Sequence, residues 1–258
     1  MVLDEIIYNK RQEVAMLKTR YVARDLPNLL KELPRTRDFK NAFRQGELRL
    51  IAELKKASPS AGLLCLDYNP ASIAKVYEES GAAALSVLTD EKFFMGKIDD
   101  LKAAKDSTTI PVLRKDFIVD ESQIYESRLF GADAVLLIAR VLSEEEIKHF
   151  LQLSEELGMQ ALVEVHNARE METALKLPAK IIGINNRDLN SLQISLQNTF
   201  HLLEKYPEAK ERIIISESGI QKREEVKLLE KAGVGGILVG ETLLKSKNIP
   251  EKIRELIR

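Results

Sequence analysis

The patterns of a strand, a helix and a second strand follow one another in GADAVLLIARVLSEEEIKHFLQLSEELGMQALVEVH (131–166). Its two apolar runs, 134–140 and 161–166, are apolar on both faces, which is typical of buried parallel strands. Between them, Ser143 and Glu146 form a capping box that predicts the start of a helix, and Gly158 predicts its end. The stretch therefore predicts one β–α–β unit with parallel strands.

The same unit recurs along the chain from residue 48 onward. Helix signals lie between the apolar runs: Asn69-Pro70 begins one helix and Gly81 ends it, Asn167 caps another, and Gly131 and Gly233 stand where helices end. Eight such units predict an α/β fold, the (β/α)8 TIM barrel. The runs predicted to be strands are 48–54, 83–89, 111–117, 134–140, 161–166, 181–186, 213–218 and 236–241.

A doubly wound open sheet is the alternative fold, but neither GxGxxG nor a P-loop follows the first run. The residues before that run predict a helical extension. LDEIIYNKRQEVAMLKTRY (3–21) predicts one amphipathic helix, RDFKNAF (37–43) predicts a short second one, and such a segment would cover one barrel end. We therefore expect a single (β/α)8 barrel domain over 1–258, with 1–47 as its N-terminal helical extension.

Composition argues against several classes of protein. Lys plus Arg number 39 and Asp plus Glu number 40, so a formal net charge of −1 gives no basic footprint for nucleic acid or anionic membrane. One cysteine and three scattered histidines offer neither a disulfide nor the spacing of a metal cluster. No signal peptide and no run of ~18 apolar residues is present. We expect a cytoplasmic monomer or weak homo-oligomer with no metal, cofactor, nucleic-acid or membrane partner.

Charged side chains gather at the carboxyl ends of the runs, where barrel enzymes place their active sites. Glu53 and Lys55 end the first run and are two residues apart, so they share a face of the strand. Lys115 lies in the third run and Glu164 in the fifth. A charge inside a buried run must be paired or functional, so these four are the leading candidate catalytic residues.

The other polar residues near the carboxyl ends of the runs are less clearly catalytic. Asn185 and Arg187 share a face at the end of the sixth run. His166 follows Glu164 by two residues, and we expect a loop or supporting role for it rather than acid–base chemistry. Four further charges are expected to be ordinary loop charges outside the core: Lys56, Arg114, Asp116 and Asp188.

The last two strand ends indicate a phosphate site. SESGI (216–220) and VGETL (239–243) each place a glycine, Gly219 and Gly240, between a strand and a helix. Backbone N–H groups at helix starts attract anions, and the loops after strands 7 and 8 are a recurrent phosphate site in this fold. The pair therefore predicts phosphate binding.

The chain also resembles a known family, indole-3-glycerol phosphate synthase, which belongs to tryptophan biosynthesis. The resemblance begins at KRQEV (10–14) and continues through eight ordered motifs: IAELKKASPS (51–60), LTDEKFFMG (88–96), LRKDFI (113–118), GADAVLLI (131–138), LVEVH (162–166), GINNRDL (183–189), SESGI (216–220) and LVGETL (238–243). It implies a (β/α)8 barrel with an N-terminal helical segment. With 258 residues there is no room for a second, fused barrel, so the monofunctional form is expected.

The resemblance implies a reaction and no cofactor. The substrate would be 1-(2-carboxyphenylamino)-1-deoxyribulose 5-phosphate, which closes a ring and loses carbon dioxide and water. Lys115 would be the general acid, and we expect burial and nearby cations to lower its pKa. Glu164 would be the general base. Glu53 and Lys55 would form a second carboxylate–ammonium pair, Lys55 also touching the substrate carboxylate or phosphate, and the division of proton transfers among the four stays open.

The remaining matches imply substrate positioning. Polar groups near the reacting centre would be Asn185, Arg187, Glu217 and Ser218, with Asn185 and Ser218 counted among the candidate catalytic residues. The slot for the aryl ring would be lined by Phe94, Phe117, Leu136 and Leu189. The phosphate would be held by Ser58, Gly219, Gly240 and the backbone of Glu241.

The chain departs from the family at three positions, and two other functions compete. Many relatives have lysine at the position of Ala61 and arginine near Cys65, so closure of the first β–α loop is in doubt, whereas Glu241 in place of serine should matter little. One rival is a Schiff-base aldolase on the same fold, with Lys115 as nucleophile. The other is a phosphate-binding barrel that has lost its chemistry.

Overall fold

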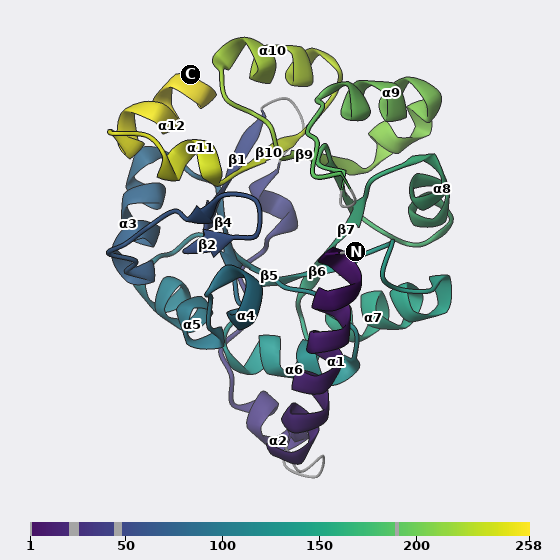
Figure 1. Cartoon of the computed structure of the whole chain (residues 1–258). Helices are drawn as coiled ribbons and strands as arrows, with labels where there is room; N and C mark the ends of the chain where they lie inside the picture. The colour runs from purple at the N-terminus through teal and green to yellow at the C-terminus, as the bar shows by residue number, and fades with distance from the viewer. Residues whose placement is uncertain (1, 21–25, 44–47, 189–190) are drawn as a thin grey trace.

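A computed structural model of the protein describes residues 2–20, 26–43, 48–188 and 191–258. Within these residues, eight parallel strands close into a barrel in the order β1-β10-β9-β8-β7-β6-β5-β4, and the helices surround it (Figure 1). The strands are β1 Arg49–Leu54, β4 Ala84–Leu88, β5 Val112–Lys115, β6 Ala134–Ile138, β7 Gln160–Val165, β8 Ile181–Asn185, β9 Ile213–Glu217 and β10 Gly236–Val239. Each lies in a predicted run, except that β7 begins one residue before its run, so the (β/α)8 barrel is confirmed and the open sheet is wrong.

The helices begin and end largely where the capping signals place them. The side chains of Asn69, Ser143 and Asn167 accept the capping N–H groups of α3, α7 and α8, and Gly131 and Gly233 have positive φ just beyond α6 and α10. The helices after β1 are α3 Pro70–Ser80, α4 Glu91–Phe94, α5 Ile98–Ser107, α6 Glu121–Leu129, α7 Glu144–Glu156, α8 Ala168–Lys176, α9 Gln197–Lys205, α10 Arg223–Lys231, α11 Glu241–Leu244 and α12 Ile249–Ile257, with the 3-10 turn η2 Pro207–Glu211.

The N-terminal segment differs in part from the prediction. Helix α1, Val2–Arg20, matches the predicted helix, except that Tyr21 lies outside the described residues, and it runs beside α6 (Figure 1). The predicted helix over 37–43 is wrong: only the single 3-10 turn η1, Lys40–Ala42, forms there, and α2, Leu26–Lys31, was not predicted. This single turn is enough to bury both aromatic side chains, and it places the ring centroids of Phe39 and Phe43 5.2 Å apart.

Successive side chains of each strand point to opposite faces of the sheet. The core therefore has two layers, one inside the barrel and one between the strands and the helices. In β1, Leu50, Ala52 and Leu54 belong to the layer between strands and helices, whereas Ile51 belongs to the cluster inside the barrel. The rings of Phe39 and Phe43 join the inner cluster. A Cβ at Gly236, the first residue of β10, would press on Phe43, so these rings lie at the N-terminal end of the strands.

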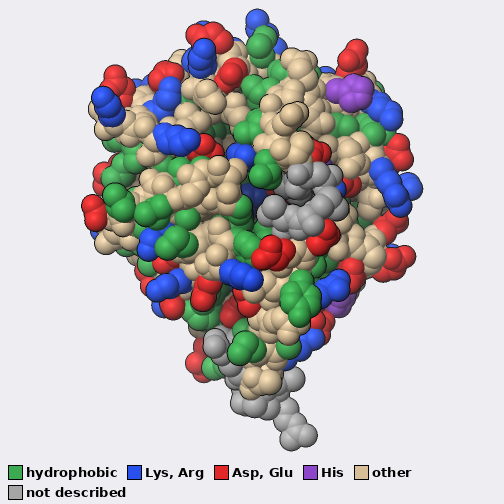
Figure 2. All heavy atoms as spheres, viewed as in Figure 1, with side chains coloured by type: hydrophobic (Ala, Val, Ile, Leu, Met, Phe, Trp, Pro, Cys, Tyr) green, Lys and Arg blue, Asp and Glu red, His purple; other side chains and the backbone are tan. Residues whose placement is uncertain are grey.

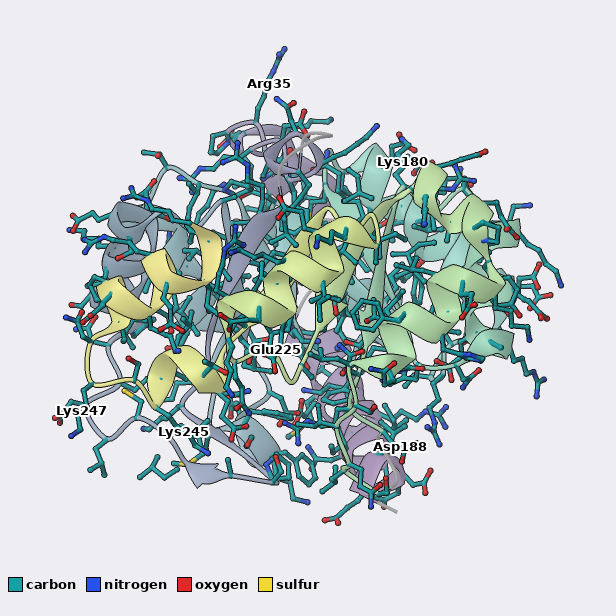
Figure 3. The ribbon with its side chains drawn as sticks, turned by 90° about the horizontal axis from the view of Figure 1, so that it is seen from above. Arg35, Lys180, Asp188, Glu225, Lys245 and Lys247 are labelled. Carbon is teal, nitrogen blue, oxygen red and sulfur yellow. The ribbon has the colours of Figure 1, made fainter. Side chains whose placement is uncertain are left out.

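The opposite end of the barrel carries polar loops. In the side view, Asp188 and Lys245, which follow β8 and β10, lie at one end, and Arg35 and Lys180 lie at the other (Figure 3). After β1, the short strands β2 Ala57–Ser58 and β3 Gly62–Leu63 form a hairpin that was not predicted. No helix in the described part of the chain is long and apolar enough to cross a membrane.

Candidate active site

A cavity of about 590 Å³ opens among the carboxyl ends of the strands, and Lys and Arg side chains are visible in the hollow of this face (Figure 2). The predicted site residues that line it are Glu53, Lys55, Phe94, Lys115, Phe117, Leu136, Glu164, Asn185, Arg187, Glu217, Ser218, Gly219, Gly240 and Glu241. Ser58 is not brought to the cavity wall: it is buried on β2, where its hydroxyl accepts the N–H of Ala61. Leu189 lies outside the described residues.

Lys115 forms the centre of the cavity floor. Its Nζ lies 2.7 Å from Oε2 of Glu164 on β7 and 3.2 Å from Oε2 of Glu217 on β9. Gly183 of β8 is paired in register with Glu164, and a Cβ at Gly183 would collide with the Glu217 carboxylate. Glycine on the intervening strand therefore leaves the room in which the two carboxylates approach one lysine.

The charges around Lys115 separate the protonation states of the two glutamates. Burial alone would raise the pKa of Glu164, but Lys115 and His166 outweigh burial and hold it below its usual range. Burial and the nearby Glu164 carboxylate raise the pKa of Glu217 to about 8, against the lowering effect of Lys115. The surroundings therefore favour the ionised form of Glu164 and the protonated form of Glu217.

The expected lowering of the Lys115 pKa is wrong. Burial does lower it, but the carboxylates of Glu164, Glu217 and Glu53 outweigh burial, so the pKa of Lys115 is raised. The sequence shows which strand ends carry charge. It does not show that three carboxylates would surround this one ammonium group.

Glu53 and Lys55 form the second predicted pair at the end of β1. Their side chains share a face as expected, and Lys55 Nζ donates to Glu53 Oε2 at 2.7 Å. Glu53 is buried against the backbone of Gly240, where any Cβ would overlap its carboxylate. Gly240 therefore serves the carboxylate of Glu53 as well as the turn after β10.

Behind Glu164, His166 links two carboxylates. Its Nε2 lies 3.2 Å from Glu164 Oε1, and its Nδ1 lies 3.1 Å from Oε2 of Glu170, which also accepts the His166 backbone N–H. Burial alone would lower the His166 pKa, but the two carboxylates raise it to about 9. The ring is buried and is not among the cavity-lining residues, which agrees with the expected supporting role.

The loops after β9 and β10 form the cationic part of the cavity. Ser218 and Gly219 both have positive φ, and a Cβ on Gly219 would collide with Ile194. The Glu241 carboxylate lies 2.6 Å from Lys245 Nζ and 3.6 Å from an Arg187 nitrogen, so it carries its own counterions. Sequence reasoning missed three lysines that line this part, Lys222, Lys245 and Lys252. Of these three, only Lys245 had a signal in the sequence: it follows Glu241 by four residues, so the two side chains share one face of a helix.

Aromatic and aliphatic side chains form another part of the cavity wall. The rings of Phe94, at the end of α4, and Phe117, just after β5, have centroids 6.2 Å apart and are inclined by 37°. Leu136 and Ile138 of β6 line the same cavity. The two rings offer the flat apolar surface expected for an aryl slot.

The prediction of loop charges outside the core is wrong for Arg114 and Asp116. Both are buried, and an Arg114 nitrogen donates to Asp116 Oδ2 at 3.0 Å. Buried partners satisfy both charges: Arg114 pairs with Glu126 as well as Asp116, and Asp116, which also lines the cavity, pairs with Lys10. The local sequence pattern does not show these distant partners. Lys56 is half-buried and Asp188 is exposed, as expected of loop charges.

Within the described residues, no group of three or more His, Cys, Asp or Glu side chains is placed to hold a metal ion. The cavity itself offers two ammonium groups, those of Lys55 and Lys115, together with three glutamate carboxyl groups and a cationic rim.

Comparison with known proteins gives both a family and a fold neighbour. A family profile described as indole-3-glycerol phosphate synthase matches residues 3–256. The protein of that name from Desulforamulus reducens is 47% identical over 258 residues, which is 100% of this chain and 97% of that protein. Its namesake from Acetivibrio thermocellus is 45% identical over 258 residues, or 99% and 98% of the two chains.

A solved structure of N-acetylmannosamine-6-phosphate 2-epimerase from Clostridium perfringens aligns with a TM-score of 0.62 at 15% identity, over 86% of this chain and 96% of that one. That likeness shows the fold alone. The profile and the relatives, in contrast, align with this chain from α1 onward and cover the described residues that line the cavity. The chain therefore belongs to the indole-3-glycerol phosphate synthase family.

Proposed function

We propose that the cavity is where this chain converts 1-(2-carboxyphenylamino)-1-deoxyribulose 5-phosphate to indole-3-glycerol phosphate, with Lys115 as general acid and Glu164 as general base. The activity follows from the family, a carboxy-lyase of tryptophan biosynthesis that acts on a phosphorylated small molecule. The observation that carries the assignment of roles is the 2.7 Å contact between Lys115 Nζ and Glu164 Oε2 on the cavity floor.

Ring closure needs a proton donor at the ketone oxygen. As the ring carbon attacks the ketone carbon, negative charge develops on that oxygen, and a cation held in a buried site stabilises it strongly. The raised pKa of Lys115 keeps the group charged, so it gives up its proton only to a strongly basic oxygen such as the forming alkoxide. Loss of carbon dioxide then restores the aromatic ring.

Dehydration needs a base and an acid. The pKa of Glu164 is lowered and that of Glu217 is raised, and two carboxyl groups whose pKa values are pushed apart are the usual sign of distinct acid–base roles. Glu164 would therefore remove the proton, and Lys55 with Glu53 would supply a second ammonium–carboxylate pair near the leaving hydroxyl. Asn185 and Ser218, which line the same cavity, would orient the substrate hydroxyls.

The two ends of the substrate differ in chemistry, and so do the two ends of the cavity. The aryl ring would lie against Phe94 and Phe117. The phosphate would lie at the loops of Gly219 and Gly240, where Arg187 and Lys245 supply positive charge. Cytoplasmic location and a monomeric or weakly associated state stay predictions from the sequence.

The chain contains no tryptophan, so indole emission reports product directly. The protein is mixed with the substrate, and rising indole emission supports the proposal. A flat trace from a folded protein that still binds substrate would favour the non-catalytic barrel. Trapping of a lysine adduct by borohydride with a sugar phosphate would favour the aldolase, although a Schiff-base lysine must be neutral and the raised pKa of Lys115 opposes that.

A further inference from the structure

Lys10 of α1 is a buried cation that no step of the proposed reaction uses. Its side chain is 3% exposed, and its Nζ lies 2.9 Å from Asp90 Oδ2, 2.9 Å from Asp116 Oδ1 and 2.7 Å from Glu13 Oε2. Glu13 is on the same helix, but Asp90 follows β4 and Asp116 follows β5. Lys10 therefore joins the N-terminal helix to two neighbouring strand ends of the barrel.

Asp90 organises the segment that carries Phe94. It is fully buried, its Oδ1 accepts the N–H of Phe93 at 2.8 Å as the N-cap of α4, and its carbonyl accepts the N–H of Gly96. Its other oxygen, Oδ2, has no polar partner in the described part of the chain except Lys10. Lys10 is therefore the counterion of the residue that caps α4.

Asp116 organises the segment that carries Phe117. It lies directly between Lys115 and Phe117, and its Oδ1 accepts the N–H of Phe117 at 2.8 Å. The same oxygen contacts Lys10, whereas Oδ2 accepts from Thr89 and from Arg114. One ammonium group thus lies between the carboxylates that shape both aromatic segments.

We infer that Lys10 is a positioning residue for the aryl slot: its ammonium group holds Asp90 and Asp116 together and so fixes the rings of Phe94 and Phe117 relative to each other. Without that charge, two buried carboxylates would repel each other, and the segments that carry the rings would move apart. The inference rests on the proposed function, because it takes the paired rings as the aryl-binding wall. It gives the N-terminal helix a part in substrate recognition.

The test compares Lys10→Met with Lys18→Met. Methionine has a similar length without the charge, and Lys18 is on the same helix but 55% exposed, paired with Asp120 at 2.6 Å, so its loss controls for docking of the helix surface. We measure KM and kcat for the full substrate, and the Kd values of a 2-(alkylamino)benzoate, which offers only the aryl part, and of inorganic phosphate.

For Lys10→Met we expect KM and the Kd of the aryl fragment to rise by roughly tenfold, the low end of the effect of a misfitted apolar contact in a pocket. The phosphate Kd should stay within about twofold, kcat should fall less than kcat/KM, and Lys10→Arg should restore part of the loss. Lys18→Met should match the wild type. An unchanged aryl Kd in folded Lys10→Met, or equal losses for aryl fragment and phosphate, would overturn the inference.

Asp90→Asn gives a second test should Lys10→Met not fold. Asparagine caps a helix as well as aspartate does, so α4 keeps its N-cap. The amide NH2 that replaces Oδ2 would face the Lys10 ammonium group, donor against donor, so Lys10 would no longer hold this segment. The aryl Kd should again rise while the phosphate Kd is kept, and an unchanged aryl Kd would overturn the inference. Failure of the proposed function would look different from failure of this inference, because the wild-type protein itself would then produce no indole emission.

Discussion

Replacing Lys115 by methionine should destabilise the protein as well as stop the reaction. Lys115 lies between two buried carboxylates, 2.7 Å from Glu164 and 3.2 Å from Glu217. Removing one partner of a buried ion pair typically costs about 3–5 kcal/mol, because the remaining charge is left uncompensated. For a chain of this size, each kcal/mol lowers Tm by about 2–4 °C, so we expect a fall of roughly 6–20 °C near pH 8.

The destabilisation of Lys115→Met should depend on pH with a definite sign. Loss of the ammonium group raises the folded-state pKa of Glu164, which Lys115 now holds down. A carboxyl group with a raised folded pKa contributes its full stability below its unfolded pKa and loses it as pH rises through the folded pKa. The difference in Tm from the wild type should therefore be largest near pH 8 and shrink toward pH 5.

Thermal melting followed by circular dichroism at pH 5 and pH 8 tests this, together with the turnover rate. Lys102→Met is the matched control, because Lys102 is 59% exposed and its pair with Asp106 should contribute less than about 0.5 kcal/mol. Turnover should fall by about 10²–10⁴-fold in Lys115→Met, the usual contribution of a general acid. An unchanged Tm at pH 8, or a larger loss at pH 5, would refute the electrostatic reasoning.

Two further substitutions test the same floor of the cavity. Gly183→Ala places a methyl group against the Glu217 carboxylate and Leu162, so we expect a loss of about 1–3 kcal/mol in thermal melts and a lower kcat; wild-type values for both would contradict the packing argument. Glu217→Gln removes a carboxyl whose folded pKa is raised to about 8, so its stability relative to the wild type should increase from pH 5 to pH 9. A flat or opposite trend would show that Glu217 ionises normally.

The sequence predicted the regular part of the fold because each strand carries its own signal. Runs such as 134–140 and 181–186 are largely apolar, and together with the helix signals between them they predict buried parallel strands. The β2–β3 hairpin was missed because strands of two residues have no periodicity to detect. The sequence predicts a helix over 37–43, but only the turn Lys40–Ala42 forms, because the burial of Phe39 and Phe43 inside the barrel decides the local shape.

The sequence showed which strand ends carry the site residues. It did not show which charged groups lie close enough to change one another's pKa. Glu53, Lys115 and Glu164 were found because a charge in an apolar run is conspicuous, and all three line the cavity. The pKa of Lys115 was predicted with the wrong sign because it depends on distances between strands far apart in sequence. Lys10 was missed for the same reason, since its partners lie beyond β4 and β5.

If Glu164 is the base beside Lys115, Glu164→Gln should form indole very slowly even at saturating substrate. Glutamine keeps the shape of the side chain and one of its two accepting oxygens, but it cannot take up the proton. We predict a kcat at least about 100-fold below the wild type, with KM changed by no more than a few-fold. A kcat near the wild-type value combined with a large rise in KM would contradict the account, because Glu164 would then only position the substrate.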